Sequence, residues 1–176
     1  MPITIRTATV MDAAALASVA AVTFPLACPP HTSDDAKAAF IAQWLSEQRF
    51  AEYTRDPDRA VLLAELAGEP VGYTMLVFGE PHDADAAAAV AIRPTSELSK
   101  CYVLPGHHGA GIAAALMAES LRTARERGAA GIWLGVNEQN GRAQAFYAKH
   151  GFERVGTKHF TVGGRIEDDY VLARAL

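Results

Sequence analysis

The chain has 176 residues and a mass of 18.7 kDa, the size of one ordinary domain. Half of its residues are hydrophobic, although 35 of these are alanine, and 20% are charged, so the composition excludes wholesale disorder and a miniprotein that needs disulfides to fold. The net charge of −4 and the pI near 5.8 argue against a nucleic-acid partner, because nucleic-acid-binding proteins usually carry a basic face.

The N-terminus and the cysteines indicate a cellular compartment. Residues 1–6 lack a basic start followed by an apolar segment, so no signal peptide is expected, and no stretch resembles an uninterrupted membrane span. Cys28 and Cys101 form neither a disulfide framework nor a zinc-binding pair. His107 and His108 are adjacent but have no third ligand at a fixed spacing, so we expect no metal. A reduced, cytoplasmic protein without a membrane partner is expected.

The first half of the chain predicts a strand, two helices and a hairpin. Residues 3–6 alternate as a strand, and apolar residues at steps of three then predict a helix that Pro25 ends. Three prolines make residues 24–31 a loop, after which Ser33 or Asp34 caps a second helix. The remaining segments are two strands, 60–67 and 71–78, joined by a Gly-Glu-Pro turn.

The second half begins with a loop at residues 80–94 that holds a single helical turn. The later elements are predicted at 97–104 (strand), 112–127 (helix), 132–136 (strand), 140–150 (helix), 152–162 (strand) and 165–172 (strand). This order predicts an α/β (α+β) fold, with a mixed central sheet of about seven strands and helices on both faces. The chain has no internal repeat, and we interpret residues 1–176 as a single domain.

A glycine loop lies between the strand at 97–104 and the helix that follows it. Gly109-Ala110-Gly111-Ile112-Ala113-Ala114 matches the G-x-G-x-x-A fingerprint of dinucleotide-binding proteins, and Glu138 lies beyond the next strand. The context disfavours a nicotinamide cofactor, because four residues separate the strand from the first glycine and only 38 residues follow Glu138. The physical prediction is independent of that choice: glycines let backbone amides approach a ligand, and the helix N-terminus favours a diphosphate.

Two further motifs give the loop a family context. His108-x-x-Gly111-x-Ala113 follows a strand, and Asn140-x-x-Ala143-x-x-Phe146-Tyr147-x-x-x-Gly151-Phe152 follows the next strand. With these motifs, the sequence resembles the GNAT N-acetyltransferases from about residue 3 to residue 173. The resemblance implies the GNAT fold and acetyl-CoA as the cosubstrate. His108 departs from the family pattern, which has Gln or Arg at that position.

A narrower resemblance links the chain to the PaiA-like polyamine acetyltransferases, which acetylate spermidine and spermine. It is carried by residues 97–103, 133–136 and 156–163 and by Asp169 in the last strand. It implies a polyamine acceptor. The acidic net charge would suit a cationic acceptor as well, although a charge of −4 is common in soluble proteins.

The resemblance implies two catalytic residues. Tyr147 corresponds to the general acid that protonates the leaving thiolate, whereas the alternative is a tyrosine that only packs its helix on the sheet. Glu97 corresponds to an acid on the central strand that serves as the base or holds a water molecule, whereas the alternative is a surface charge at a strand start. Cys101 as a covalent nucleophile is disfavoured, because the family transfers acetyl directly to the amine.

The resemblance also implies the residues that bind the coenzyme. Backbone groups of the central strand would face the pantetheine arm, the glycine loop would bind the pyrophosphate, and Asn140 would either bond the arm or cap its helix. The implied set is Cys101, Tyr102, Val103, His108, Gly109, Ala110, Gly111, Ile112, Ala113, Asn137, Asn140 and Tyr147. A protonated His108 beside the pyrophosphate predicts coenzyme affinity that falls as pH rises through roughly 6 to 7.5.

These observations predict an acetyl-CoA-dependent N-acetyltransferase that acts on a primary amine, with a polyamine as the first choice. The alternatives are an amino acid, an antibiotic-like amine or a protein N-terminus as the acceptor, or a non-catalytic acyl-CoA-binding regulator. We expect the acceptor pocket under the loop at residues 24–31, with Asp34 and Asp35 just beyond it. A homodimer is expected from family habit.

Overall fold

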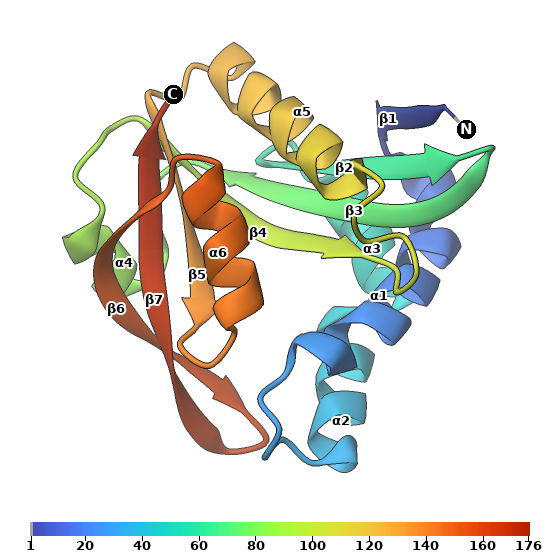
Figure 1. Cartoon of the computed structure of the whole chain (residues 1–176), viewed down its shortest axis with the longest axis horizontal. Coiled ribbons are helices and arrows are strands. Elements are labelled where there is room, and N and C mark those ends of the chain that lie inside the picture. Colours follow the sequence, from blue (N-terminus) through green and yellow to red (C-terminus); the bar gives the residue numbers. More distant parts are fainter. Residues whose placement is uncertain (1) are drawn as a thin grey trace.

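A computed structural model describes residues 2–176, which form one seven-stranded mixed sheet (Figure 1). The strands are β1 (Ile3–Thr7), β2 (Arg59–Leu66), β3 (Glu69–Phe78), β4 (Thr95–Val103), β5 (Gly131–Asn137), β6 (Glu153–Val162) and β7 (Arg165–Ala175). Their spatial order is β1-β2-β3-β4-β5-β7-β6. The pair β4–β5 is parallel and the other five pairs are antiparallel. This sheet confirms the predicted fold class.

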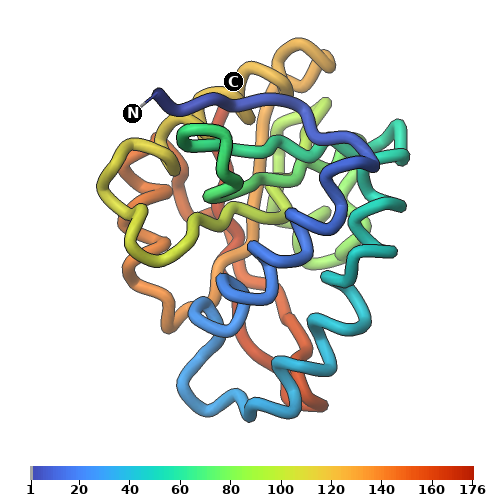
Figure 2. Tube along the Cα trace, turned by 90° about the vertical axis from the view of Figure 1, so that its right-hand side faces the viewer, coloured from blue at the N-terminus to red at the C-terminus, as the bar shows by residue number. Residues whose placement is uncertain are grey.

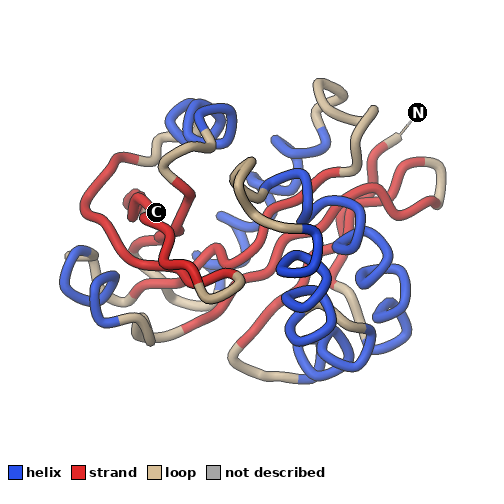
Figure 3. The backbone as a smooth tube through the Cα atoms, turned by 90° about the horizontal axis from the view of Figure 1, so that it is seen from below, coloured by secondary structure: helices blue, strands red, loops and turns tan. Residues whose placement is uncertain are grey.

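Helices cover both faces of the sheet (Figure 3). They are α1 (Ala13–Ala27, after a short 3₁₀ turn at Val10–Asp12), α2 (Asp34–Trp44), α3 (Glu47–Arg55), α4 (Ala84–Ala89), α5 (Ile112–Glu126) and α6 (Gly141–Lys149). The first four lie on one face, where α1 contacts both α2 and α3 (Figure 2). The last two lie on the other face, where α5 packs on β1–β4 and α6 lies against apolar side chains of β5 and β7.

The helix α5 illustrates how the sequence produces this packing. Its apolar residues Ile112, Leu116 and Met117 recur at helical spacing and are buried against the sheet. The hydroxyl of Ser120, on the same face, lies 2.8 Å from that of Thr74 on β3 and so satisfies both buried groups. The glycine loop that precedes α5 is therefore anchored by a rigid, fully packed helix.

The strands β4 and β5 run side by side only at their starts. Their register pairs Thr95 with Gly131, Ser96 with Ile132 and Glu97 with Trp133, and no later pair forms among the described residues. In Figure 1, β4 continues to the right while β5 runs downward. The divergence opens the middle of the sheet and leaves the backbone of β4 without a partner strand on its β5 side.

Two expectations for the first half of the chain are wrong. The helix α1 does not end at Pro25 but continues to Ala27. Pro25 removes only one amide donor near the end of the helix, and the ring of Phe24 stacks on Phe40 of α2 at 4.5 Å, which holds the last turn in place. The segment between residues 47 and 55 also forms the helix α3, which the sequence pattern did not predict.

The stretch Val10–Ala27 has 18 residues and a mean hydropathy of 1.7, which is long and apolar enough to cross a membrane by composition alone. Within the fold 33% of this stretch is buried, on one face of the helix: Leu16, Val19 and Phe24 pack against β3 and the neighbouring helices. Core helices of soluble proteins show the same composition, so this stretch is weak support for a membrane span.

Candidate active site

A cavity of about 300 Å³ lies where β4 and β5 diverge. Residues from both halves of the chain line it: β4 and β5 form its floor, α6 one wall, and the end of α1 with the hairpin β6–β7 the other. The loop after α1 borders it through Cys28 and Pro29, and the acceptor pocket is expected under this loop. Asp34 and Asp35 are not among its lining residues, because they lie in the first turn of α2, and the Asp34 side chain is exposed.

The β4 residues Cys101, Tyr102 and Val103 lie at the edge of the opening. Each is paired with β3, opposite Thr74, Tyr73 and Gly72 respectively, and none is paired with β5. The β5 side of this strand can therefore donate and accept hydrogen bonds with an extended, amide-containing ligand. The carbonyl of Val103 is an exception, because it already accepts a hydrogen bond from His108 Nε2 at 3.0 Å.

The glycine loop after β4 is built for an anion. Gly109 and Gly111 have φ values of 83° and 81°, in the left-handed region that favours glycine, and a Cβ atom at either position would meet open space. Gly111 is the residue that precedes α5, and no side chain caps this helix. The first-turn amides of α5, including those of Ile112 and Ala113, are thus free to bind a diphosphate. Ala110, in the loop before them, belongs to the same predicted binding site.

His108 lies at the glycine loop between the end of β4 and the helix α6. Its Nε2 atom faces the carbonyl of Val103 and its Nδ1 atom faces the guanidinium of Arg142 on α6. Arg142 therefore places a permanent positive charge beside the glycine loop, next to His108. The sequence motifs did not single out Arg142.

The two asparagines on the α6 side of the cavity have structural partners. Asn140 precedes α6, and its side-chain oxygen accepts a hydrogen bond from the amide of Ala143 at 3.2 Å, which is the predicted cap. The side-chain oxygen of Asn137 accepts from the amide of Gln139 at 2.9 Å, which shapes the turn after β5. Both asparagines line the cavity, so capping and ligand binding are compatible.

Tyr147 on α6 projects toward the middle of the sheet, where its hydroxyl faces the Cys101 thiol. Burial raises the pKa of the Tyr147 hydroxyl well above 10, so the phenol keeps its proton at neutral pH. Burial likewise raises the pKa of Cys101 to about 12. Because the thiolate is the nucleophilic form, this thiol is unreactive at neutral pH, which agrees with the expectation that Cys101 is not a covalent nucleophile.

Glu97 lies on β4 at the last position that pairs with β5, where the two strands separate. Its side chain lines the cavity, and burial raises its pKa above 4.5. The positive charges of Lys158, Lys100 and Arg59 act in the opposite direction, in that order of strength. Glu97 is therefore a partly buried carboxylate inside the cavity, not a surface charge at a strand start.

A second carboxylate, Asp169 on β7, was noted in the sequence only for its family resemblance. Burial raises its pKa to about 6, an effect that Lys158 partly offsets. Its Oδ2 atom lies 3.8 Å from Lys158 Nζ, whereas its Oδ1 atom is buried without a hydrogen-bond partner among the described residues. An unpartnered carboxylate oxygen beside a cavity is a feature typical of a ligand-binding site.

The cavity also contains Lys100, which lies in the segment 97–103 of the narrower resemblance but was given no role there. Burial lowers the pKa of its ammonium from 10.5 to about 8, although Glu97 raises it. Lysine and carboxylate side chains from three strands thus meet at one place: Glu97, Lys100, Lys158, Glu167 and Asp169. The pairing of β3 with β4 contains a β-bulge beside Ser99, so the side chains of Lys100 and Glu97 lie on the same face of the sheet. In a strand with regular alternation, these two side chains would lie on opposite faces.

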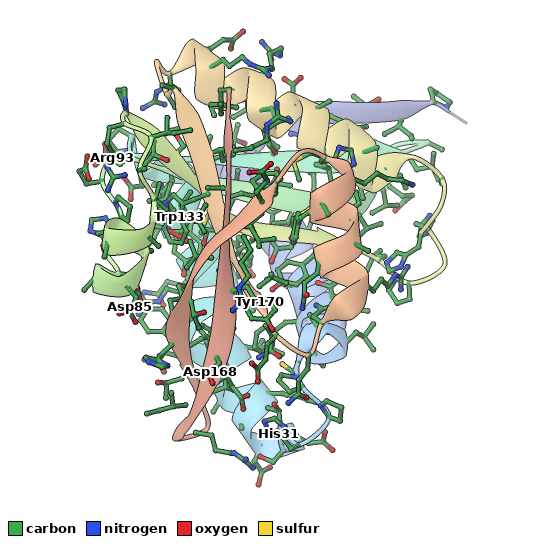
Figure 4. The ribbon with its side chains drawn as sticks, turned by 60° about the vertical axis from the view of Figure 1, so that its left-hand side comes forward. His31, Asp85, Arg93, Trp133, Asp168 and Tyr170 are labelled. Carbon is green, nitrogen blue, oxygen red and sulfur yellow. The ribbon has the colours of Figure 1, made fainter. Side chains whose placement is uncertain are left out.

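The loop after α1 is tied to the hairpin by a hydrogen-bonded pair, His31 and Glu167, which joins residues 136 positions apart. Figure 4 labels His31 and Asp168 at the same end of the molecule, where this loop meets β7. Phe160 on β6 packs its ring edge against Phe40 at 5.7 Å and adds an apolar wall. Among residues 2–176, no group of three or more His, Cys, Asp and Glu side chains is arranged to hold a metal ion.

Comparison with known proteins gives this geometry a family. The family model "Acetyltransferase (GNAT) family" matches residues 25–152. An uncharacterized N-acetyltransferase of Mycobacterium tuberculosis is 51% identical over 165 residues, which cover 94% of this chain and 98% of the relative.

Two solved structures have the same fold over nearly their full lengths. The PaiA N-acetyltransferase of Thermoplasma acidophilum, in complex with coenzyme A, is 20% identical with a TM-score of 0.79 and full coverage of both chains. A ribosomal-protein-alanine N-acetyltransferase of Brucella melitensis is 30% identical with a TM-score of 0.66 and covers 98% of this chain and 99% of its own. The chain belongs to the GNAT acetyltransferase family and is an acetyl-CoA-dependent N-acetyltransferase.

Proposed function

We propose that the protein acetylates a primary amine of a small molecule by direct attack of the amine on the thioester of acetyl-CoA, with both substrates bound at once. The observation that supports this most is the position of Tyr147 and Glu97 around one opening in the sheet, with the glycine loop directly after β4. The loop suits the diphosphate of the coenzyme, and the unpaired edge of β4 suits its amide-containing arm.

The roles of the side chains follow from their protonation states. The amine nitrogen forms a bond to the thioester carbon while the carbon–sulfur bond breaks, so one proton must leave the amine and one must reach the sulfur. Glu97, a carboxylate at the separation of β4 and β5, accepts the first, directly or through water. Tyr147, whose phenol is protonated at neutral pH, donates the second. Cys101 takes no covalent part.

The acceptor predicted from the sequence is a polyamine. Some charged side chains of the cavity favour a polyamine and others disfavour it. Three carboxylates, Glu97, Glu167 and Asp169, favour a cationic amine. Two ammonium groups, Lys100 and Lys158, line the same space and would repel a polycation. The enclosure of the site by the loop after α1 supports a small acceptor over a protein N-terminus.

A thiol-release assay tests the proposal. Purified protein, acetyl-CoA and a panel of amines, which includes spermidine, diamines, amino acids and an alanine-terminated peptide, should give acceptor-dependent release of coenzyme A. The Tyr147→Phe variant should remove this release while it still binds coenzyme A. Binding of coenzyme A without release on any amine would contradict the proposal and favour the alternative of a non-catalytic acyl-CoA-binding regulator.

A further inference from the structure

The mechanism proposed above leaves Lys100 without a role. Its side chain lines the cavity from the centre of the sheet, on the same face as Glu97. Burying an ammonium group costs free energy unless the group is paired. An unpaired lysine at this position therefore destabilises the fold, so we expect Lys100 to have a partner.

The other lysine of the cavity has such a partner and Lys100 does not. Lys158 lies 3.8 Å from Asp169. Within residues 2–176, Lys100 forms no ion pair: the charged groups that influence it are Glu97 on its own strand and Arg59 on β2. Arg59 is itself held by Asp56 at 3.1 Å and by the ring of Tyr53. Lys100 is therefore the lysine of the cavity that is free to bind a ligand.

We infer that the acceptor carries a carboxylate close to its reacting amine, and that Lys100 binds this carboxylate. The inference rests on the proposed function and adds the class of the acceptor, an amino acid with a second amine. A carboxylate fits better than a phosphate, because one ammonium supplies one positive charge and the cavity already holds three carboxylates.

The cavity also offers a partner for the second ammonium group of such an acceptor. Asp169 Oδ1 is buried without a hydrogen-bond partner in the described chain, so an ammonium group can donate to it without displacing Lys158 from Oδ2. Glu97 then remains for the amine that reacts. With three carboxylates and two lysines, the cavity has a formal charge of −1, which complements the charge of +1 on a diamino acid at neutral pH.

Two pairs of acceptors that differ only by a carboxylate test the inference: lysine with cadaverine, and ornithine with putrescine. Acetylation is followed by thiol release, and binding to the coenzyme A complex is followed by calorimetry. The variants are Lys100→Met, which removes the charge at a similar length, and Lys100→Arg, which keeps it. Lys149→Met, at an exposed position of α6 outside this cavity, is the matched control.

The wild-type protein should prefer one or both of the carboxylate acceptors in kcat/KM and in binding. Lys100→Met should raise the KM and Kd of that amino acid by about 10- to 100-fold and leave those of its diamine unchanged or lower. Lys100→Arg should retain the preference, and the control should behave as wild type. Spermidine serves as the competing polyamine acceptor.

The two proposals fail in different ways. Equal or better use of the diamines or spermidine by the wild-type protein, or an equal loss for both members of a pair in Lys100→Met, overturns the inference but leaves N-acetyl transfer standing. Carboxylate-dependent binding without turnover supports the inference and contradicts the proposed function. Absence of binding by both lysine and ornithine overturns the inference.

Discussion

Lys158 Nζ lies 3.8 Å from Asp169 Oδ2, and the stem of Lys158 crosses β5 directly above Gly135. The strand register explains the contact: Asp169 is opposite Lys158 on β6 and opposite Asn137 on β5, so the three residues form one row across the sheet. A Cβ atom at position 135 would lie 2.5 Å from the Cε atom of Lys158. The absence of a side chain at Gly135 is therefore what lets this ion pair border the cavity.

The substitution Gly135→Ala should displace Lys158 and disturb acceptor binding. The clash falls on the end of a flexible side chain, so the free energy of unfolding should change by less than about 1 kcal/mol, while the KM of the acceptor rises several-fold. Denaturant unfolding and acceptor kinetics measure the two effects. Gly141→Ala, where a Cβ would meet open space in the first turn of α6, is the control. An unchanged acceptor KM in Gly135→Ala would refute the positioning role of the pair.

The pH dependence of stability should report the burial of Asp169. Its pKa in the folded protein is about 6, raised from 3.8 by desolvation, so between these values the folded state binds more protons than the unfolded state. The contribution of Asp169 to the free energy of unfolding is therefore largest below pH 4 and is lost as pH rises toward 6. Urea unfolding at pH 4.5 and 7 should show a smaller decrease for Asp169→Asn than for wild type.

The neighbouring Asp168 supplies the matched control for that measurement. It is about half exposed and pairs with His159 at 3.0 Å on the outer side of the hairpin. Asp168→Asn should retain the wild-type decrease between pH 4.5 and 7. A decrease of equal size in wild type and Asp169→Asn would show that Asp169 titrates as an ordinary surface carboxylate.

Glu97 should control the acidic side of the rate profile. Burial raises its pKa above 4.5, so kcat/KM should fall as pH decreases through the range in which this carboxylate is protonated. Glu97→Gln should lower kcat/KM by about 10²-fold at neutral pH and remove this acidic limb. Glu65→Gln, a carboxylate on β2 that pairs with Arg6 away from the cavity, should keep both the rate and the limb. An unaltered profile in Glu97→Gln would assign the base elsewhere.

Coenzyme affinity should depend on Arg142. Its guanidinium faces His108 beside the glycine loop and carries a permanent charge, which favours a diphosphate at the N-terminus of α5. Arg142→Gln should weaken coenzyme A binding by roughly 2- to 5-fold, as an exposed charge contact does. Arg122→Gln, in the C-terminal part of α5, is the control. Coenzyme A binding as tight in Arg142→Gln as in wild type would show that the guanidinium takes no part in binding.

The sequence predicted what depends on local pattern. The strands, the glycine loop, the helix α5 and the position of Tyr147 all follow from apolar spacing and motif, and the structure has each of them. The sequence could not predict the charged interior of the cavity, because Lys100, Lys158 and Asp169 come from three strands and meet only through the sheet order β4-β5-β7-β6. The face of the sheet on which Lys100 lies depends on a β-bulge, and the spacing of apolar residues in the sequence does not predict that bulge.

The assignment of Tyr147 leads to the most direct kinetic prediction. Its buried phenol, which faces the Cys101 thiol and keeps its proton at neutral pH, is the only donor assigned to the leaving sulfur, so Tyr147→Phe should lower kcat by about 10²- to 10⁴-fold. The ring still packs against Phe146 and Phe152, so the melting temperature and the Kd of coenzyme A should change little. Tyr170→Phe removes a hydroxyl from a tyrosine whose ring stacks with Arg154 outside the cavity, and it should leave kcat unchanged. Turnover by Tyr147→Phe at the wild-type rate would show that the aromatic ring serves packing alone.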